Sequence, residues 1–217
     1  MLCYMLGMAL ATGRPLLGFT PARAYRVLYF DQENGPADRV QYERWAWHGL
    51  GQPPLDLVCE SFWCAPFVLG SPTWAATART FILRHTPEVI VIDTTTPACH
   101  IDQENDNAEA ARVITTLRTL QALSTPPATL LAIKHAKLRS EGGGYTLRGG
   151  KAWEGAVDSI IYHVRAEGHP RKDGLANTTL YPAKTRAFGL RVPVHITPAW
   201  TPDHQGLVLT RVKIGSS

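Results

Sequence analysis

Apolar segments that stop abruptly at polar residues alternate with helical segments over the first 135 residues of this chain. The apolar segments carry many β-branched and aromatic residues, as buried strands do, and they span residues 25–30, 55–59, 88–92 and 129–133. The helical segments are predicted at residues 1–11, 36–48, 71–84 and 108–123. This alternation predicts a mostly parallel sheet flanked by helices, because parallel neighbours need a crossover connection.

The last third of the chain is rich in strands instead, which are predicted at residues 158–164, 178–183, 192–197 and 206–213. We expect them to extend the parallel sheet with antiparallel pairs, which gives an α/β fold with C-terminal antiparallel strands. A length of 217 residues suits a single domain, residues 1–217. A composition that is 45% hydrophobic and 18% charged excludes an intrinsically disordered chain.

Residues 1–11 are the longest apolar stretch, but a span of the bilayer needs about 20 residues, and the basic start of a signal peptide is missing. We therefore expect a soluble, cytoplasmic protein with no membrane partner. The four cysteines show no CxxC spacing, which favours buried reduced thiols over a metal site. A net charge of +4 permits an acidic partner such as nucleic acid without requiring one.

Polar side chains follow three of the predicted strands: Glu33, Asp93 and His135. Ligands of parallel α/β proteins bind beyond the carboxyl ends of the strands, so these residues predict a shared site. A carboxylate fixed at the end of a strand, such as Asp93, suits Mg²⁺. Glu33 is placed to orient a water as a general base, and His135 to contact a phosphate. The alternative is that all three are ordinary solvated or structural groups, since most parallel strands end in polar residues.

Lys184 and Arg186 would project from one side of a late strand, because side chains two residues apart share a face. Two adjacent cations suit the stabilisation of charge on a phosphoryl group. The alternative is a solvated strand face.

Six segments occur in an order and at spacings that resemble one known family: LYFDQENGPADR, VIVIDTTT, DQENDNAEAARVITTLRTLQ, LLAIKHAK, LRGGKAWEGAVDSI and AKTRAFG. Together they resemble the RecA-like ATPases of the RepA type, which are hexameric plasmid replicative helicases and their relatives. The resemblance covers almost the whole chain. It implies an ATP- and Mg²⁺-dependent motor that acts in DNA replication or remodelling.

The resemblance also implies roles for individual residues. Asp93 matches the Walker B carboxylate on the Mg²⁺ side, Glu33 the acidic residue that polarises the attacking water, and His135 the histidine after the sensor strand. Lys184 and Arg186 match the basic pair that each subunit of a ring inserts into its neighbour's nucleotide site. The implied partner is the chain itself, in a hexameric ring.

Two loops, at residues 100–107 and 136–150, lie where relatives present DNA-binding segments to a central channel. The second is expected to be a flexible, glycine-rich and basic loop. Lys137, Arg139 and Arg148 are the candidate contacts to the phosphates of single-stranded DNA. The alternative is an ordinary solvated loop.

The family's phosphate loop, GxxxxGK[ST], is absent from the sequence. The nearest segment, GYTLRGGK, fails the spacing, and Ala152 follows it where Ser or Thr must ligate Mg²⁺. In relatives the loop immediately precedes the helix that is predicted here at residues 1–11. We expect that the chain is truncated before this helix, and that loss of the preceding strand exposes strand edges and the apolar helix.

Two other functions stay open. A degenerate, non-catalytic RecA-like module would lack its own phosphate loop and assemble with active partners. An unrelated Mg²⁺-dependent hydrolase or nuclease would use Asp31, Glu33 and Asp93 as a cluster of carboxylates.

Overall fold

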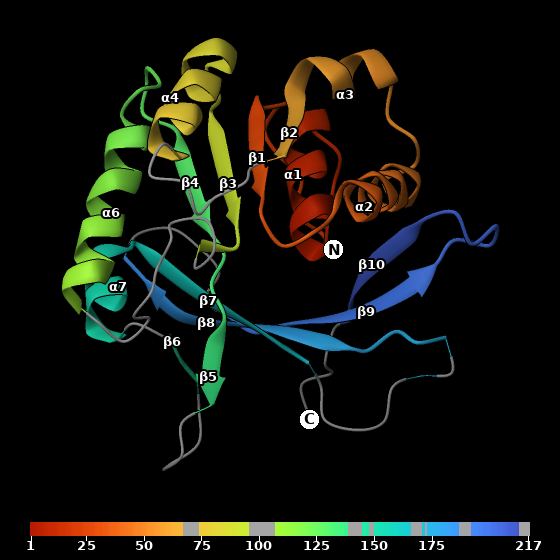
Figure 1. Cartoon of the computed structure of the whole chain (residues 1–217). Coiled ribbons are helices and arrows are strands. Elements are labelled where there is room, and N and C mark those ends of the chain that lie inside the picture. The colour runs from red at the N-terminus through yellow and green to blue at the C-terminus, as the bar shows by residue number, and fades with distance from the viewer. Residues whose placement is uncertain are drawn as a thin grey trace.

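The computed structural model of the protein describes residues 1–66, 74–95, 107–138, 145–147, 150–165, 171, 173–186 and 192–212. Its centre is a parallel sheet of four strands in the order β2-β1-β3-β4. The strands are β1 (Val27–Asp31), β2 (Phe62–Pro66), β3 (Val89–Asp93) and β4 (Thr129–Ala132). The predicted α/β fold with a parallel sheet flanked by helices is therefore confirmed (Figure 1).

Helices cover both faces of this sheet, and the alternation of side chains along β1 explains how. Leu28 and Phe30 point to one core, which is completed by α4 (Trp74–His85) and α6 (Asn107–Gln121). Val27 and Tyr29 point to a second core. The helices of this second side are α1 (Leu2–Thr12), α2 (Pro36–Gly49) and α3 (Leu55–Ser61). Figure 1 shows these two groups of helices on opposite sides of the sheet.

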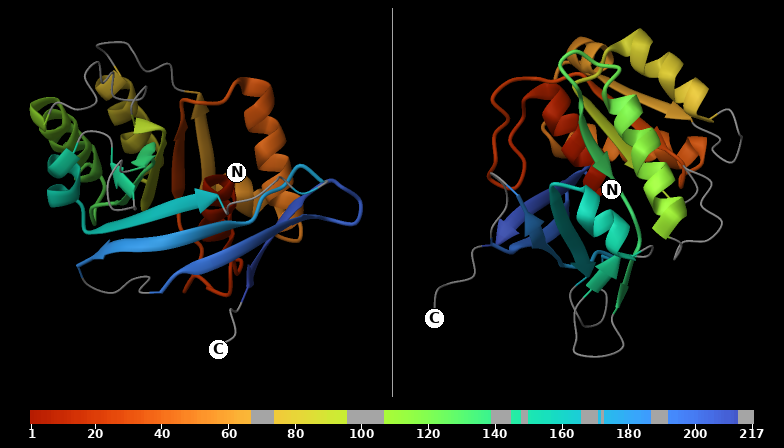
Figure 2. Two further views of the ribbon diagram at one scale, coloured as in Figure 1. Left: turned by 90° about the horizontal axis from the view of Figure 1, so that it is seen from below. Right: turned by 90° about the vertical axis from the view of Figure 1, so that its left-hand side faces the viewer.

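The last four strands form a sheet of their own in the order β10-β9-β8-β7, with antiparallel neighbours. They are β7 (Ser159–Arg165), β8 (Thr178–Thr185), β9 (Val194–Trp200) and β10 (Leu207–Val212). The prediction that they extend the parallel sheet is wrong. The reason is that β9 buries Val194 and Ile196 in the core around α1, so the sheet packs as a separate layer. Figures 1 and 2 show it crossing below the carboxyl ends of the parallel strands.

Two further expectations differ from the structure. Residues 55–59 were predicted as a strand, which is wrong: they belong to helix α3, and the strand begins at Phe62. Pro54 occupies the N-cap position of this helix, and the aromatic pair Phe62-Trp63 favours the strand after it. Within residues 136–150, where a loop is expected, β5 (Ala136–Leu138) pairs with β6 (Tyr145–Leu147) as antiparallel strands.

The first helix is buried, as its apolar residues on all sides predict, and the exposure expected from loss of a preceding strand is not observed. Tyr4, Met5 and Met8 are between 0% and 2% exposed, because α2, α3 and the antiparallel sheet cover α1. β2 and β4 are the edge strands of the parallel sheet, and the residues of β4 are half-buried or exposed. None of the helices in the described part of the chain is long and apolar enough to cross a membrane.

The contact between α2 and β10 fixes the antiparallel sheet against the helical layer, and it depends on a glycine. A methyl group at Gly49 would lie 1.8 Å from the carbonyl oxygen of Leu207, far inside van der Waals contact. We expect Gly49→Ala to lower the free energy of unfolding by about 1–3 kcal/mol, as overpacking does. Gly155→Ala is the matched control, because nothing lies within 4 Å of its added methyl, and it should gain roughly 0.5–1 kcal/mol of helix stability. Urea unfolding of both variants checks this, and equal stabilities would contradict it.

Candidate functional site

Two carboxylates lie side by side where β1 and β3 end. Asp31 and Asp93 are direct partners in the register of these parallel strands. Each accepts a hydrogen bond from a tyrosine hydroxyl: Tyr4 donates to Asp31, and Tyr29 donates to Asp93 at 2.5 Å. The two tyrosine rings stack with their centroids 4.5 Å apart. Two buried, stacked tyrosines therefore hold the carboxylates at the ends of β1 and β3.

Burial raises the pKa of Asp93, and the negative charges of Asp31 and Glu33 raise it further, while the hydrogen bond from Tyr29 lowers it. Burial also raises the pKa of Tyr29, helped by the charge of Asp93, so this phenol stays protonated and donates. An ionised Asp93 is thus held against the preference of its surroundings. A bound cation would relieve this cost, so the site fits Mg²⁺ at this carboxylate.

The described residues contain no cluster of three or more His, Cys, Asp or Glu side chains that could hold a metal ion by themselves.

Glu33 and His135 meet across the end of β3. Nε2 of His135 lies 3.7 Å from Oε1 of Glu33, and their side chains are 56% and 48% exposed. Glu33 follows β1 and His135 follows β4, the two strands that flank β3. The three strand ends that were predicted to share a site therefore converge on one edge of the sheet. The chemical roles of the three residues stay predictions.

Lys184, in β8, and Arg186, one residue after that strand, both contact the carbonyl end of α7 (Gly150–Ala156). The Lys184 ammonium donates to the carbonyl of Glu154, and Arg186 donates to the carbonyl of Gly155 at 2.8 Å. Arg186 also lies 3.4 Å from the Asp158 carboxylate. Cations are favourable at the negative end of a helix dipole. These contacts give the pair a structural role within the subunit, whatever its role toward a neighbour.

A third cation binds the same helix end, since Arg118 donates to the carbonyl of Ala156 at 2.7 Å. At its other side α7 buries Trp153, over whose ring the ammonium of Lys134 lies at 5.4 Å. α7 is therefore clamped between α6, the end of β4 and the antiparallel sheet.

The candidate DNA contacts fall mostly outside the described residues. The backbone of Lys137 is part of β5, whereas Arg139, Arg148 and residues 100–106 lie outside the described ranges. Their role stays a prediction.

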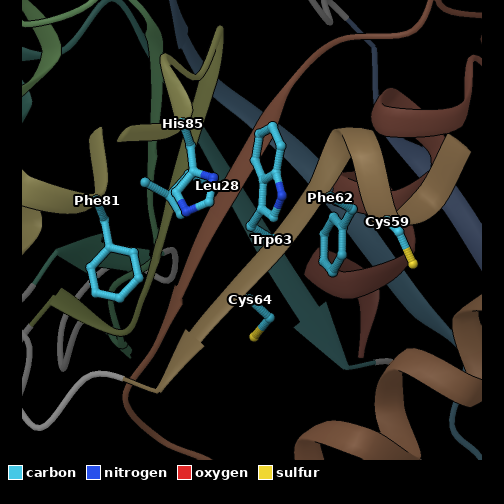
Figure 3. A pocket seen from close by; sticks show the side chains of 7 residues that line it. All are labelled: Leu28, Cys59, Phe62, Trp63, Cys64, Phe81 and His85. Atoms are coloured by element: carbon cyan, nitrogen blue, oxygen red, sulfur yellow. The ribbon is translucent and has the colours of Figure 1, made fainter. Parts of the chain in front are cut away.

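A hollow of about 370 Å³ opens beside the edge strand β2 (Figure 3). Its lining is largely apolar and aromatic: Leu28, Cys59, Phe62, Trp63, Cys64, Phe81 and His85. The rings of Trp63 and His85 lie 4.5 Å apart, and burial lowers the pKa of His85. Burial also raises the pKa of the Cys64 thiol to about 12, so this cysteine is not a nucleophile at neutral pH.

The sequence did not identify Tyr4 and Tyr29 as hydrogen-bond donors of the site, and it did not indicate that Asp31 is buried. Asp31 was predicted only as one of three metal-binding carboxylates, yet it is 2% exposed and bonded to Tyr4. Tyr29 precedes Asp31 by two residues and so shares its face of the strand, which is a usable signal. Tyr4 is 27 residues away from Asp31, and nothing local could have paired the two.

A parallel sheet with an acidic carboxyl edge is the architecture of many nucleotide-handling proteins. A sequence model of the family described as AAA domain matches residues 1–141 of the chain. The chain therefore belongs to this family, which places it among the P-loop ATPases. The match does not distinguish the RepA type within that class. No curated protein matches the chain.

The unfavourable ionisation of Asp93 can be tested without nucleotide. Asp93→Asn removes a partly buried negative charge beside Asp31 and Glu33 and keeps an oxygen that can accept the Tyr29 hydrogen bond. We expect its melting temperature at pH 7 to rise by about 2–4 °C, which is roughly 1 kcal/mol in a domain of this size.

The gain should shrink as the pH falls through the raised pKa of Asp93, because the protonated carboxyl of the parent protein no longer carries the charge. Glu33→Gln, which changes a half-exposed carboxylate, should leave the melting temperature within about 1 °C. A lower melting temperature for Asp93→Asn would show that Asp93 stabilises the fold.

Proposed function

We propose that the chain is the ATPase domain of a RecA-like, ring-forming motor of the DNA helicase type. In this proposal ATP is hydrolysed with Mg²⁺ at the interfaces between subunits, the ring is a hexamer, and the work is done on single-stranded DNA in replication or remodelling. The observation that carries the proposal is the convergence of Asp93, Glu33 and His135 on one edge of the sheet, in a chain of a P-loop ATPase family.

Each residue has a chemical task in this reaction. Asp93, fixed by Tyr29, would hold Mg²⁺, which when bound offsets the negative charge of the phosphates. Glu33 would orient the attacking water and accept its proton, because it is half-exposed and its carboxylate can reach solvent. His135, across β3 from Glu33, would donate a hydrogen bond toward the terminal phosphate.

The main competing enzyme class, a two-metal nuclease or hydrolase, needs Asp31 as a free ligand. In the structure Tyr4 and Asn34 donate hydrogen bonds to Oδ2 of Asp31, and Asn34 also reaches Oδ1. Both oxygens of this carboxylate are thus engaged, which favours the ATPase over the nuclease.

A second candidate function is a non-catalytic RecA-like module that assembles with active partners. It is favoured by one observation, the absence of GxxxxGK[ST] from the 217 residues. Such a module would lend Lys184 and Arg186 to a neighbour.

DNA contact is proposed for the basic residues of segment 136–150, namely Lys137, Arg139 and Arg148. The segment leads directly into α7, which begins at Gly150. Contacts to phosphates would make DNA affinity fall steeply with salt.

Nucleotide binding is expected to be weak in residues 1–217 alone, because the backbone N–H groups of a phosphate loop and its lysine supply most of the phosphate grip. Calorimetry with Mg-ATP should give a Kd weaker than about 1 mM. A fusion that places a strand and a GxxxxGK[ST] loop before Met1 should bind at least tenfold more tightly. Tight binding of Mg-ATP by residues 1–217 would contradict this placement of the phosphate site.

The trans role of the basic pair is tested in a form of the protein that hydrolyses ATP. Arg186→Ala should leave nucleotide binding nearly intact and lower hydrolysis by about 10³–10⁵, the range for trans-supplied arginines. Mixing Arg186→Ala with Glu33→Ala subunits should restore part of the activity, because some interfaces pair an intact Glu33 with an intact Arg186.

Arg118→Ala is the matched control, since Arg118 binds the same end of α7 but is not one of the pair. If Arg118→Ala loses as much activity as Arg186→Ala, or if mixed rings show no rescue, the pair acts by holding α7 and not in trans.

A further inference from the structure

Asp31 is the most heavily hydrogen-bonded carboxylate at the edge of the sheet, and it is almost completely buried, with 2% of its surface exposed. Oδ1 accepts the backbone N–H groups of Glu33 and Asn34, each at 3.0 Å. The side-chain amide of Asn34 lies 3.2 and 3.1 Å from the two oxygens. The hydroxyl of Tyr4 completes the set. A buried carboxylate without such donors would be very costly, so this arrangement is specific.

The two backbone contacts determine the path of the chain after β1. A carboxylate that accepts the N–H groups two and three residues further on forms an Asx turn, which fixes the direction of the loop. On the other side of the loop, the backbone N–H of Gln32 donates to the carbonyl of Asp93 at 2.6 Å. The backbone of Glu33 is therefore held between Asp31 and the end of β3.

Tyr4 connects this loop to α1. Its ring is fully buried and lies between Tyr29, at 4.5 Å between centroids, and Tyr42, at 5.6 Å. Its hydroxyl reaches Asp31 from the first turn of the helix. A rigid ring, one hydrogen bond and two backbone contacts thus join the start of α1 to Glu33.

We propose that Asp31 is the positioning residue of Glu33, and that Tyr4 ties this position to the first turn of α1. The side chain of Glu33 is half-exposed and is not held by burial, so its direction toward His135 depends on its backbone. The inference rests on the proposed function in one respect, namely that Glu33 is the residue that orients the attacking water.

The test uses the chain as it is, without nucleotide, and reads the Glu33–His135 contact by NMR. Glu33→Gln sets the reference, because it removes the charged partner of the His135 ring and shifts the ring resonances. Tyr4→Phe and Asn34→Ala each remove donors to Asp31 and leave Glu33 in place. Both should move the His135 resonances at least halfway to the reference, and amide exchange at Glu33 and Asn34 should accelerate at least tenfold.

Tyr29→Phe is the matched control. This substitution also removes a hydroxyl from the stack of tyrosine rings, but the hydroxyl of Tyr29 donates to Asp93 and not to Asp31. We expect the His135 resonances of this variant to stay within one fifth of the reference shift. Asn34 lies in a loop, so its variant decides the question if Tyr4→Phe does not fold.

Unchanged amide exchange and unchanged His135 resonances in Asn34→Ala would overturn the inference, and so would an equal effect of Tyr29→Phe. A failure of the proposed function looks different. In a form of the protein that hydrolyses ATP, hydrolysis that survives Glu33→Gln would remove Glu33 from the chemistry, while the NMR result on the chain as it is would still decide whether Asp31 holds the backbone of Glu33.

Discussion

The parallel pairing of β1 with β3 is the constraint on which the rest of the site depends. Its register places Asp31 directly beside Asp93, and both carboxylates lie largely away from solvent. Two neighbouring buried charges of the same sign are unfavourable unless donors are aimed at them. The stacked tyrosines Tyr4 and Tyr29 supply these donors on the face of the sheet that α1 covers. The same two tyrosines therefore pack α1 against the sheet and supply the hydrogen bonds that the neighbouring carboxylates need.

The core of the fold could be predicted from the sequence because its signals are local. The β-branched run of β3 and the apolar face of α6 identify their elements without any knowledge of partners. The segment around Leu55 could not be assigned in this way, since a short apolar run does not separate helix from strand. The position of the last four strands also escaped prediction, because the burial of Val194 and Ile196 against α1 is a contact between distant parts of the chain.

In the candidate site, too, the features with local signals could be predicted and the contacts between distant residues could not. That Glu33, Asp93 and His135 would converge followed from strand ends alone, since the carboxyl ends of parallel strands share an edge. The partners of those residues did not follow, because Tyr4 comes from a helix whose pattern indicates only burial. Lys184 and Arg186 were predicted as a pair, yet their contacts with the carbonyl groups of α7 depend on how the antiparallel sheet lies beside that helix.

The two ends of α7 belong to different parts of the predicted machinery. The helix begins at Gly150, the last residue of the segment predicted to contact DNA, and the carbonyl groups at its other end accept hydrogen bonds from Arg118, Lys184 and Arg186. A helix of seven residues is only about 10 Å long and is stiff over that distance. α7 is therefore a short, rigid connection between the predicted DNA-binding segment and the three basic residues. A load applied at its first residue is shared between these three cation–carbonyl contacts, which lead to α6 and the end of β8, and the packing of Trp153 in the core beside the parallel sheet.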